Sequence, residues 1–287
     1  IGLGGPFLED FRLFHARLGI KDMVCLEIDA NTHKRQMFNK PFGGIKCIHS
    51  SIEDYVIEAE FDSPVLMWLD FTNPKEIQNQ IELFSNLLIE IPLLSILRIT
   101  LNANPTSLGK PEPDELKSQI DKGIKSNEAE LSWRLDRFKN RFSTFCPADL
   151  TYEGMSHRNY GKSVLEAVRL SAEKVILDRP GVKIVWLFST HYSDGQPMVT
   201  ATVIILNNND VQIEQTLSGW EFHSTPSEPL LLDLPALSVL ERLKLEQGDI
   251  SEEGLGFKLP KSLLKGNSFE LFKKYYRVFP HFSRVEL

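Results

Sequence analysis

Residues 1–29 read IGLGGPFLEDFRLFHARLGIKDMVCLEID, and the order of features in this stretch decides the fold class. Glycines stand at positions 2, 4 and 5. Behind them, residues 6–19 carry apolar side chains at helical spacing and end at Gly19, a natural C-cap. Residues 23–29 then form a short apolar run that ends in acids. A glycine turn, a helix and a strand ending in a carboxylate follow one another in this order in nucleotide-binding βαβ units.

The same alternation continues to about residue 105. We expect further strands over 44–50, 63–71 and 93–104, and helices over 31–40, 51–59 and 73–91. Strands separated by helices predict a parallel sheet that is covered by helices on both faces. The predicted fold class is therefore α/β, with a Rossmann-like, doubly wound and mostly parallel sheet.

The pattern changes after Pro105. A polar, proline-containing segment leads into an amphipathic helix over 131–145, and a second such helix is expected over 161–177. Two β-rich runs around Ser193-Asp194-Gly195 then predict a terminal antiparallel hairpin over 183–206. The predicted domains are a core of residues 1–206 with a helical and polar insertion at about 106–158, and a C-terminal extension of residues 207–287 packed on the core.

Composition restricts the classes of function. The chain has 287 residues and a formal net charge of −7, which argues against a surface built throughout for nucleic acid. Its apolar stretch over 83–101 is interrupted by Glu90, Pro92 and Arg98 and predicts no membrane span. Three widely spaced cysteines form neither a disulfide framework nor a zinc spacing, so a reducing, cytoplasmic location is expected.

The glycine cluster has two readings. In a cofactor loop, the ligand approaches the backbone, the helix N-terminus offers N–H groups, and Glu27 or Asp29 accepts from the ribose hydroxyls. The alternative is a plain tight turn. Phe7 stands where G-x-G-x-x-G requires its third glycine, which counts against NAD. Because the sequence has no initiating Met and no strand-like run ahead of the glycines, we expect the strand of this unit to precede residue 1.

Four motifs in order resemble those of class I S-adenosylmethionine-dependent methyltransferases. They are IGLGGP (1–6), VCLEID (24–29), IHSSIEDY (48–55) and MWLDFTNP (67–74). The expected hairpin also fits, since the seven-stranded sheet of that family ends in an antiparallel strand. The resemblance covers about residues 1–105 and 160–206, and it implies S-adenosylmethionine as the cofactor.

The resemblance also implies a cofactor-binding set. Carried over by position, this set is Gly2, Gly4, Gly5, Glu27, Ser50 and Ser51. The glycines would meet the methionine part of the cofactor, the glutamate its ribose and the serines its adenine. Ser51 departs from the family, which often has an Asp there, and DFTNP (70–74) matches no acceptor-specific signature.

Candidate catalytic residues lie at and after the end of the strand expected over 63–71. Asp70 would act as a base or orient the acceptor, and Thr72 and Asn73 would hydrogen-bond it. Capping of the next helix is the alternative for Asp70 and Asn73. Asn102 and Asn104 are expected at the same edge, but one carboxylate and two amides hold Mg²⁺ poorly, so no metal site is predicted.

Two other groups of side chains have weaker functional readings. His49 is the one histidine expected near the adenine, whereas His191 and Tyr192, beside the hairpin turn, are expected at the surface. The aromatic and basic segment FKKYYRVFPHFSR (272–284) suits single-stranded nucleic acid, but a helix docked on the core is the commoner meaning.

The favoured function is an S-adenosylmethionine-dependent methyltransferase acting on an O or N acceptor of unknown identity. The insertion and the C-terminal extension leave a macromolecular acceptor or a protein partner open, while nucleic acid is not favoured and no membrane partner is expected. The alternative is a catalytically inactive methyltransferase-like subunit that serves binding or assembly. An NAD-dependent oxidoreductase is disfavoured by the missing third glycine.

Overall fold

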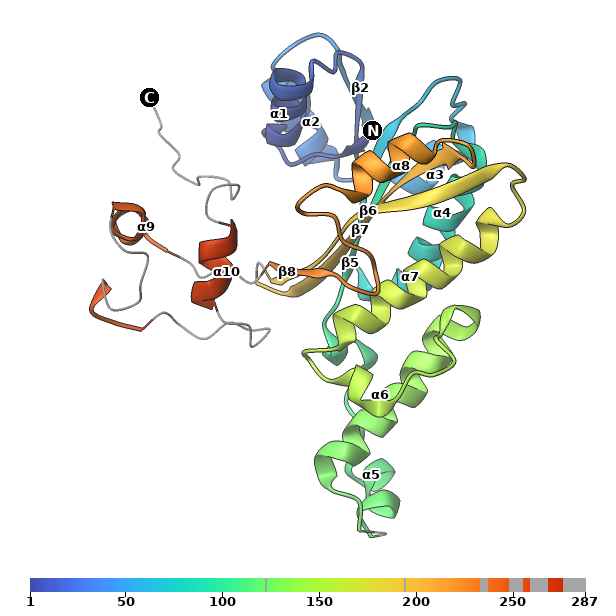
Figure 1. Cartoon of the computed structure of the whole chain (residues 1–287), viewed down its shortest axis with the longest axis vertical. Helices are drawn as coiled ribbons and strands as arrows, with labels where there is room; N and C mark the ends of the chain where they lie inside the picture. The colour runs from blue at the N-terminus through green and yellow to red at the C-terminus, as the bar shows by residue number, and fades with distance from the viewer. Residues whose placement is uncertain (122, 194, 233–236, 248–254, 259–267, 276–287) are drawn as a thin grey trace.

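A computed structural model describes residues 1–287 apart from residues 122, 194, 233–236, 248–254, 259–267 and 276–287 (Figure 1). The strands are β1 (Gly2–Leu3), β2 (Met23–Glu27), β3 (Ile45–His49), β4 (Leu66–Asp70), β5 (Ile96–Asn102), β6 (Val182–Ser193), β7 (Pro197–Asn207) and β8 (Leu230–Leu232).

Helices separate these strands along the chain. The α-helices are α1 (Glu9–Leu18), α2 (Ala30–Asn39), α3 (Ile52–Glu58), α4 (Ile77–Glu90), α5 (Pro113–Ile120), α6 (Ser126–Phe142), α7 (Tyr160–Ile176), α8 (Val211–Ser218), α9 (Val239–Gln247) and α10 (Ser268–Tyr275). Short 3₁₀ turns are η1 (Pro74–Glu76), η2 (Pro105–Leu108), η3 (Ser143–Phe145) and η4 (Tyr152–Met155). None of the helices in the described part of the chain has both the length and the apolar character that crossing a bilayer requires.

The strands form one mixed sheet in the order β3-β2-β1-β4-β5-β7-β6-β8. Strands β1 to β5 run parallel to one another, and β7 pairs antiparallel with β5 and with β6. This arrangement confirms the predicted α/β class, the mostly parallel sheet and the antiparallel hairpin. The strand order reverses between β1 and β4, where ligands bind in doubly wound sheets.

The structure corrects the expected place of the first strand. Gly2 and Leu3 are themselves β1, and they pair in parallel with Cys25 and Leu26 of β2. Of the three glycines, Gly2 is therefore part of the sheet, and Gly4 and Gly5 form the turn into α1.

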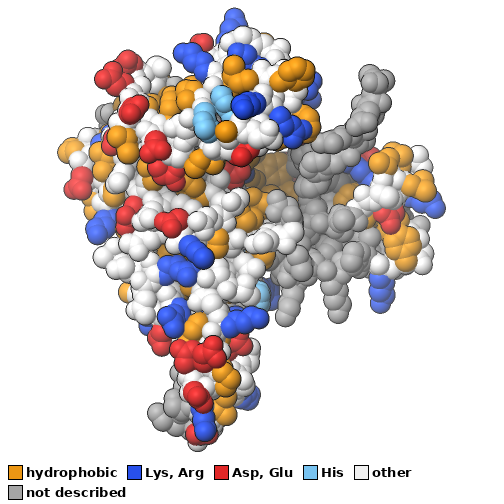
Figure 2. Space-filling view, turned by 180° about the vertical axis from the view of Figure 1, so that it is seen from behind, with side chains coloured by type: hydrophobic (Ala, Val, Ile, Leu, Met, Phe, Trp, Pro, Cys, Tyr) orange, Lys and Arg blue, Asp and Glu red, His pale blue; other side chains and the backbone are white. Residues whose placement is uncertain are grey.

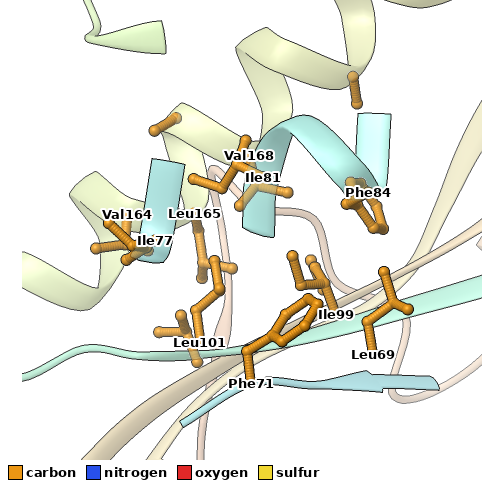
Figure 3. Packing of buried hydrophobic residues seen from close by; sticks show 14 of the residues in the cluster. Leu69, Phe71, Ile77, Ile81, Phe84, Ile99, Leu101, Val164, Leu165 and Val168 are labelled. Atoms are coloured by element: carbon orange, nitrogen blue, oxygen red, sulfur yellow. The ribbon is translucent and has the colours of Figure 1, made fainter. Parts of the chain in front are cut away.

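One face of the sheet carries the main core. Side chains of α4 and α7 pack on alternate residues of β4 and β5, and Figure 3 shows Leu69, Phe71 and Ile99 pointing toward these helices. Phe84 at the centre of this layer is fully buried, so its replacement by Ala would cost about 3–5 kcal/mol. Since successive side chains of a strand point to opposite faces, Trp68, Asp70 and Arg98 lie on the other face.

That other face is covered in two places. Leu8 and Phe11 at the start of α1 pack on Met23, Cys25 and Ile45 of the neighbouring strands. At the far side of the sheet, Leu217 of α8 packs against a second small cluster that includes Ile204 and Leu206. Helices thus cover both faces, as the sequence predicts.

The insertion is more helical than the sequence suggests. Its polar segment contains α5, and α6 begins at Ser126, before the expected start at residue 131. Figure 1 shows α5 and α6 projecting from the body at the end of the sheet where β5 finishes. The Phe138 and Phe142 rings of α6 stack with centroids 3.9 Å apart, and Tyr160 of α7 meets Phe138 edge-on. These aromatic contacts fix the base of the projection to the core.

The C-terminal extension contributes a strand to the sheet. Its β8 pairs in parallel with β6, and the Tyr275 ring lies 6.0 Å from that of Phe222. The division into a core and an extension stays a prediction. Residues 276–284 of the aromatic and basic segment lie outside the described residues.

One expected surface position is wrong. His191 is 5% exposed, because β6 continues through it and the ring packs on Gly161 of α7. A Cβ added at Gly161 would lie 2.7 Å from the imidazole, so the glycine is what lets α7 approach the strand.

Candidate functional site

The carboxyl ends of the parallel strands bring the predicted site residues to one edge of the sheet. The Ser50 N–H, just after β3, donates to the Glu27 carbonyl at the end of β2 over 3.1 Å. The Phe71 N–H, just after β4, donates to the Thr100 carbonyl of β5 over 3.1 Å. The predicted glutamate and serine are therefore direct neighbours, and the segment that carries Asp70 is held against β5.

Gly4 and Gly5 have different physical roles in the turn. A Cβ at Gly4 would lie 2.8 Å from the Cys25 Sγ and 2.9 Å from the Phe11 ring, so close packing requires glycine there. A Cβ at Gly5 would meet no heavy atom within 4 Å. Packing within the chain explains the first glycine, whereas the second leaves the backbone open to a ligand.

Two amide side chains of α2 hold this turn, and the sequence reading missed both. The Gln36 Nε2 donates to the Gly4 carbonyl and, at 3.3 Å, to the Glu27 Oε2. The Asn39 Nδ2 donates to the Pro6 carbonyl at 2.8 Å. Gln36 is fully buried although its helix is polar. The available signal was two amides three residues apart, which share one helical face.

The structure separates the two candidate acids. Asp29 caps α2, since its Oδ1 accepts from the Thr32 N–H at 2.7 Å. This hydrogen bond holds the pKa of the Asp29 carboxyl below its usual range. Glu27 is half-buried beside the turn, and its Oε1 accepts from the Asp29 N–H at 2.8 Å. Each carboxylate oxygen offers two lone pairs, so Glu27 keeps acceptor capacity for a ligand.

The two serines after β3 also differ. The Ser51 Oγ accepts from the Asp54 N–H at 3.0 Å and donates to the Asp54 Oδ2 at 2.8 Å, so it caps α3. The Ser50 Oγ donates to the Ser51 carbonyl at 3.1 Å. Nearby, the imidazole of His49 stacks on that of His33 with centroids 5.6 Å apart. Capping gives Ser51 a structural role beside any contact with a ligand.

Asp70 and Asn73 behave differently in the segment after β4. The Asn73 Oδ1 accepts from the Lys75 N–H at 3.1 Å and caps η1, as the alternative reading expects. The Asn73 carbonyl in turn accepts from the buried Gln80 at 2.9 Å. Asp70 lies on the opposite face from the core and interacts electrostatically with Arg98. Thr72 and Asn73 are exposed, so both side chains are open to an acceptor.

The two asparagines after β5 are engaged in local hydrogen bonds. The Asn102 Oδ1 accepts from the Asn104 N–H at 2.9 Å, and the Asn104 Oδ1 accepts from the Thr106 N–H at 3.1 Å. Both oxygens thus shape the backbone after β5. Within the residues that the structure describes, no three His, Cys, Asp or Glu side chains gather in a group that could hold a metal ion.

A cavity of about 580 Å³ lies at the other edge of the sheet. It is lined by the first residues of several strands, Met23, Leu66 and Ile96 among them, and by Phe11 and Phe14 of α1. Gly2 of the predicted cofactor-binding set lines this cavity, but the other members of that set do not. Because ligands of doubly wound sheets bind at the carboxyl ends of the strands, the candidate site is taken to lie at the opposite edge.

Comparison with protein families gives one match. A family model described as "Putative O-methyltransferase" matches residues 1–287. No curated protein sequence matches the chain.

Solved structures match only distantly. "A Pericyclic Reaction enzyme" is 11% identical with a TM-score of 0.35, and the match covers 71% of this chain and 42% of that one. The plantazolicin methyltransferase BamL, solved in complex with a triazolic desmethylPZN analog and SAH, is 10% identical with a TM-score of 0.34, covering 72% and 76%. The cyclopropane synthase MmaA2 from Mycobacterium tuberculosis is 11% identical with a TM-score of 0.31, covering 71% and 76%. The chain thus spans less than half the length of the first of these proteins.

Proposed function

Because the chain belongs to the O-methyltransferase family whose model matches it throughout, we propose that it transfers a methyl group from S-adenosylmethionine to an oxygen of an acceptor. The observation that supports the proposal is the meeting of the Gly4-Gly5 turn, Glu27 and Ser50 at one edge of the sheet. The methyl group is supplied on a sulfonium sulfur, which keeps the electron pair of the broken C–S bond as the acceptor oxygen forms the new C–O bond.

The residues at this edge fit such a cofactor. Gly5 leaves the backbone of the turn open, where the methionine part of the cofactor can approach. Glu27 offers carboxylate oxygens that can accept from both ribose hydroxyls. The backbone of Ser50 and Ser51 borders the expected place of the adenine.

Asp70 is the proposed proton acceptor. It is the last residue of β4, at the same edge of the sheet. The next residue is Phe71, whose N–H bonds to β5. The Asp70 carboxylate takes the proton that the acceptor hydroxyl loses, while Thr72 and Asn73 orient that hydroxyl. Methyl transfer from a sulfonium depends mainly on holding the nucleophile in line and out of water, so positioning matters more than a strong base.

Calorimetric titration with S-adenosylmethionine and S-adenosylhomocysteine tests the cofactor. We expect micromolar binding of both, lost in Glu27→Ala and kept in Asp29→Asn, which preserves the cap of α2. No binding at millimolar ligand would contradict the proposal. Binding by the wild type without transfer of labelled methyl to a panel of hydroxyl-bearing acceptors would favour the alternative, a binding or assembly subunit. The observation behind that alternative is that Ser51 and Asn73 cap α3 and η1, so a structural role can account for both residues.

A further inference from the structure

A basic pocket lies beside the segment that carries the candidate catalytic residues. Its volume is about 370 Å³, and its lining residues come from η1, the first turn of α4, η2 and the end of α6. The lining residues are Lys75, Glu76, Gln78, Asn79, Leu108, Arg137, Asn140 and Arg141. Figure 2 shows Lys and Arg side chains where the projection of α5 and α6 joins the body, with Asp and Glu side chains next to them on the projection.

Cations outnumber acids in this pocket. Lys75, Arg137 and Arg141 face one lining carboxylate, Glu76, whose Oε2 already accepts from the Asn79 Nδ2 at 2.7 Å. Among the described residues, neither Lys75 nor Arg141 forms an ion pair. In a chain whose formal net charge is −7, a local excess of positive charge favours the binding of an anionic ligand.

The two guanidinium groups are held in place. The Arg141 Nη1 donates to the Ser107 carbonyl at 3.0 Å and lies 3.5 Å from the Pro74 carbonyl. Arg137 lies over the Trp133 ring, 4.9 Å from its centroid, and 3.6 Å from Glu115 of α5. A guanidinium has five N–H donors, so each arginine keeps donors for a ligand after these contacts. Arginine forks beside a lysine match the oxygens of a phosphate group.

We propose that this pocket binds a phosphate group of a small-molecule acceptor and thereby orients the acceptor toward Asp70. The inference rests on the proposed methyl transfer, and it gives the insertion a function, since two of the three cations come from α6. The pocket adjoins the segment that carries the candidate catalytic residues, because Arg141 lies 3.5 Å from the Pro74 carbonyl at the end of residues 70–74. Nucleic acid is not the proposed ligand, since the cations gather in one pocket and not along a groove.

Binding of pyrophosphate to the full chain tests the pocket without any methyl transfer. By calorimetry at low salt, we expect Lys75→Ala and Arg137→Gln each to weaken binding about fivefold or more, because each removes a charge-assisted contact. Lys139→Ala, which removes a charge from α6 outside the pocket, should bind as the wild type does. Acetate, which offers one carboxylate, should bind more weakly than pyrophosphate.

The outcomes separate this inference from the proposed function. Equal pyrophosphate binding by Lys75→Ala, Arg137→Gln and Lys139→Ala would overturn the pocket, even if S-adenosylmethionine binds. Tighter binding of a short single-stranded oligonucleotide than of pyrophosphate would overturn the small-molecule ligand. Pyrophosphate binding that depends on Lys75, in a protein that does not bind S-adenosylmethionine, would support the anion pocket and contradict the methyltransferase proposal. Circular dichroism of each variant checks that the fold is intact.

Discussion

The N–H of Ser50, which follows β3, donates to the carbonyl oxygen of Glu27, the last residue of β2, over 3.1 Å. This bond joins the ends of β2 and β3, so we expect a ligand held by the Glu27 carboxylate to meet the backbone that follows β3 as well. The buried Gln36 adds the Gly4-Gly5 turn to the same group through its contacts with Gly4 and Glu27. Predictions about the cofactor site therefore concern a single connected cluster.

The two glycines of the turn should respond in opposite ways to replacement by Ala. At Gly4 the methyl group would lie 2.8 Å from the Cys25 Sγ, so we expect Gly4→Ala to lower the free energy of unfolding by about 1–3 kcal/mol. At Gly5 the methyl group enters open space, so the stability of Gly5→Ala should stay within about 0.5 kcal/mol of the wild type.

Gly5→Ala, which should leave stability unchanged, should weaken the binding of S-adenosylmethionine. A methyl group where the cofactor approaches the backbone should weaken the affinity of Gly5→Ala about tenfold, a cost of about 1.4 kcal/mol. Denaturant unfolding and calorimetry on the two variants measure both effects. If Gly5→Ala binds as tightly as the wild type, the turn does not contact the cofactor.

Gln36 is predicted to be a positioning residue for the cofactor site. In Gln36→Leu the buried Gly4 carbonyl loses its donor, which should cost about 1–3 kcal/mol of stability. The affinity for S-adenosylmethionine should fall as well, because the turn and Glu27 lose their common support.

A stability loss alone would not prove this role, so a matched variant is needed. Ser85→Ala breaks the buried hydrogen bond of 2.6 Å between Ser85 and Ser171, which joins α4 to α7 away from the site. It should lower the unfolding free energy and leave cofactor affinity unchanged. Equal affinity losses in Gln36→Leu and Ser85→Ala would mean that Gln36 acts only through global stability.

Sequence periodicity was sufficient for the parallel sheet because each buried strand, such as residues 66–70, lies between helices with a clear apolar face. Long-range pairing was not readable in the same way. The chain's first strand is two residues long, and only its pairing with Cys25 and Leu26 defines it. Gln36 was missed because its burial depends on the glycine turn 32 residues away. His191 was misplaced because its ring packs on Gly161 of α7, a contact between segments that the hairpin pattern alone does not show.

The candidate site residues were chosen from the order of motifs, and they stay predictions. The structure shows that some of these residues also have local structural roles, which the sequence could only leave open as alternatives. Asn73 caps η1 and Ser51 caps α3, while Asp70 interacts electrostatically with Arg98. Whether these residues also contact ligands stays a prediction that the binding experiments test.

Alkaline pH should destabilise the fold through Tyr160. Burial raises the pKa of its phenol from 10.0 to about 12, so between these values the unfolded chain loses this proton and the folded chain keeps it. Stability from this group is therefore full below pH 10 and falls as pH rises toward 12, by at most about 1.4 kcal/mol per pH unit.

Urea unfolding at a series of pH values checks this sign. Tyr160→Phe removes the phenol and should show a shallower loss of stability over the same range than the wild type. At neutral pH it should be less stable than the wild type by about 1 kcal/mol, because the hydrogen bond with Ser107 is lost. Parallel pH profiles for the two proteins would show that Tyr160 does not titrate in this way.

The three thiols should differ in reactivity. Cys25 is fully buried in β2, and burial raises the pKa of its thiol to about 12, so almost no thiolate forms at pH 8. Cys146 and Cys47 are half-buried, so alkylating reagents reach them more easily. Peptide mapping by mass spectrometry after iodoacetamide treatment should find label on Cys146 and Cys47 long before Cys25. In denaturant all three thiols should react at similar rates.

The Cys25 side chain is covered by Phe11 of α1 and by Leu8, which directly precedes this helix. Labelling of native Cys25 as fast as Cys146 would therefore show that α1 opens readily from the sheet.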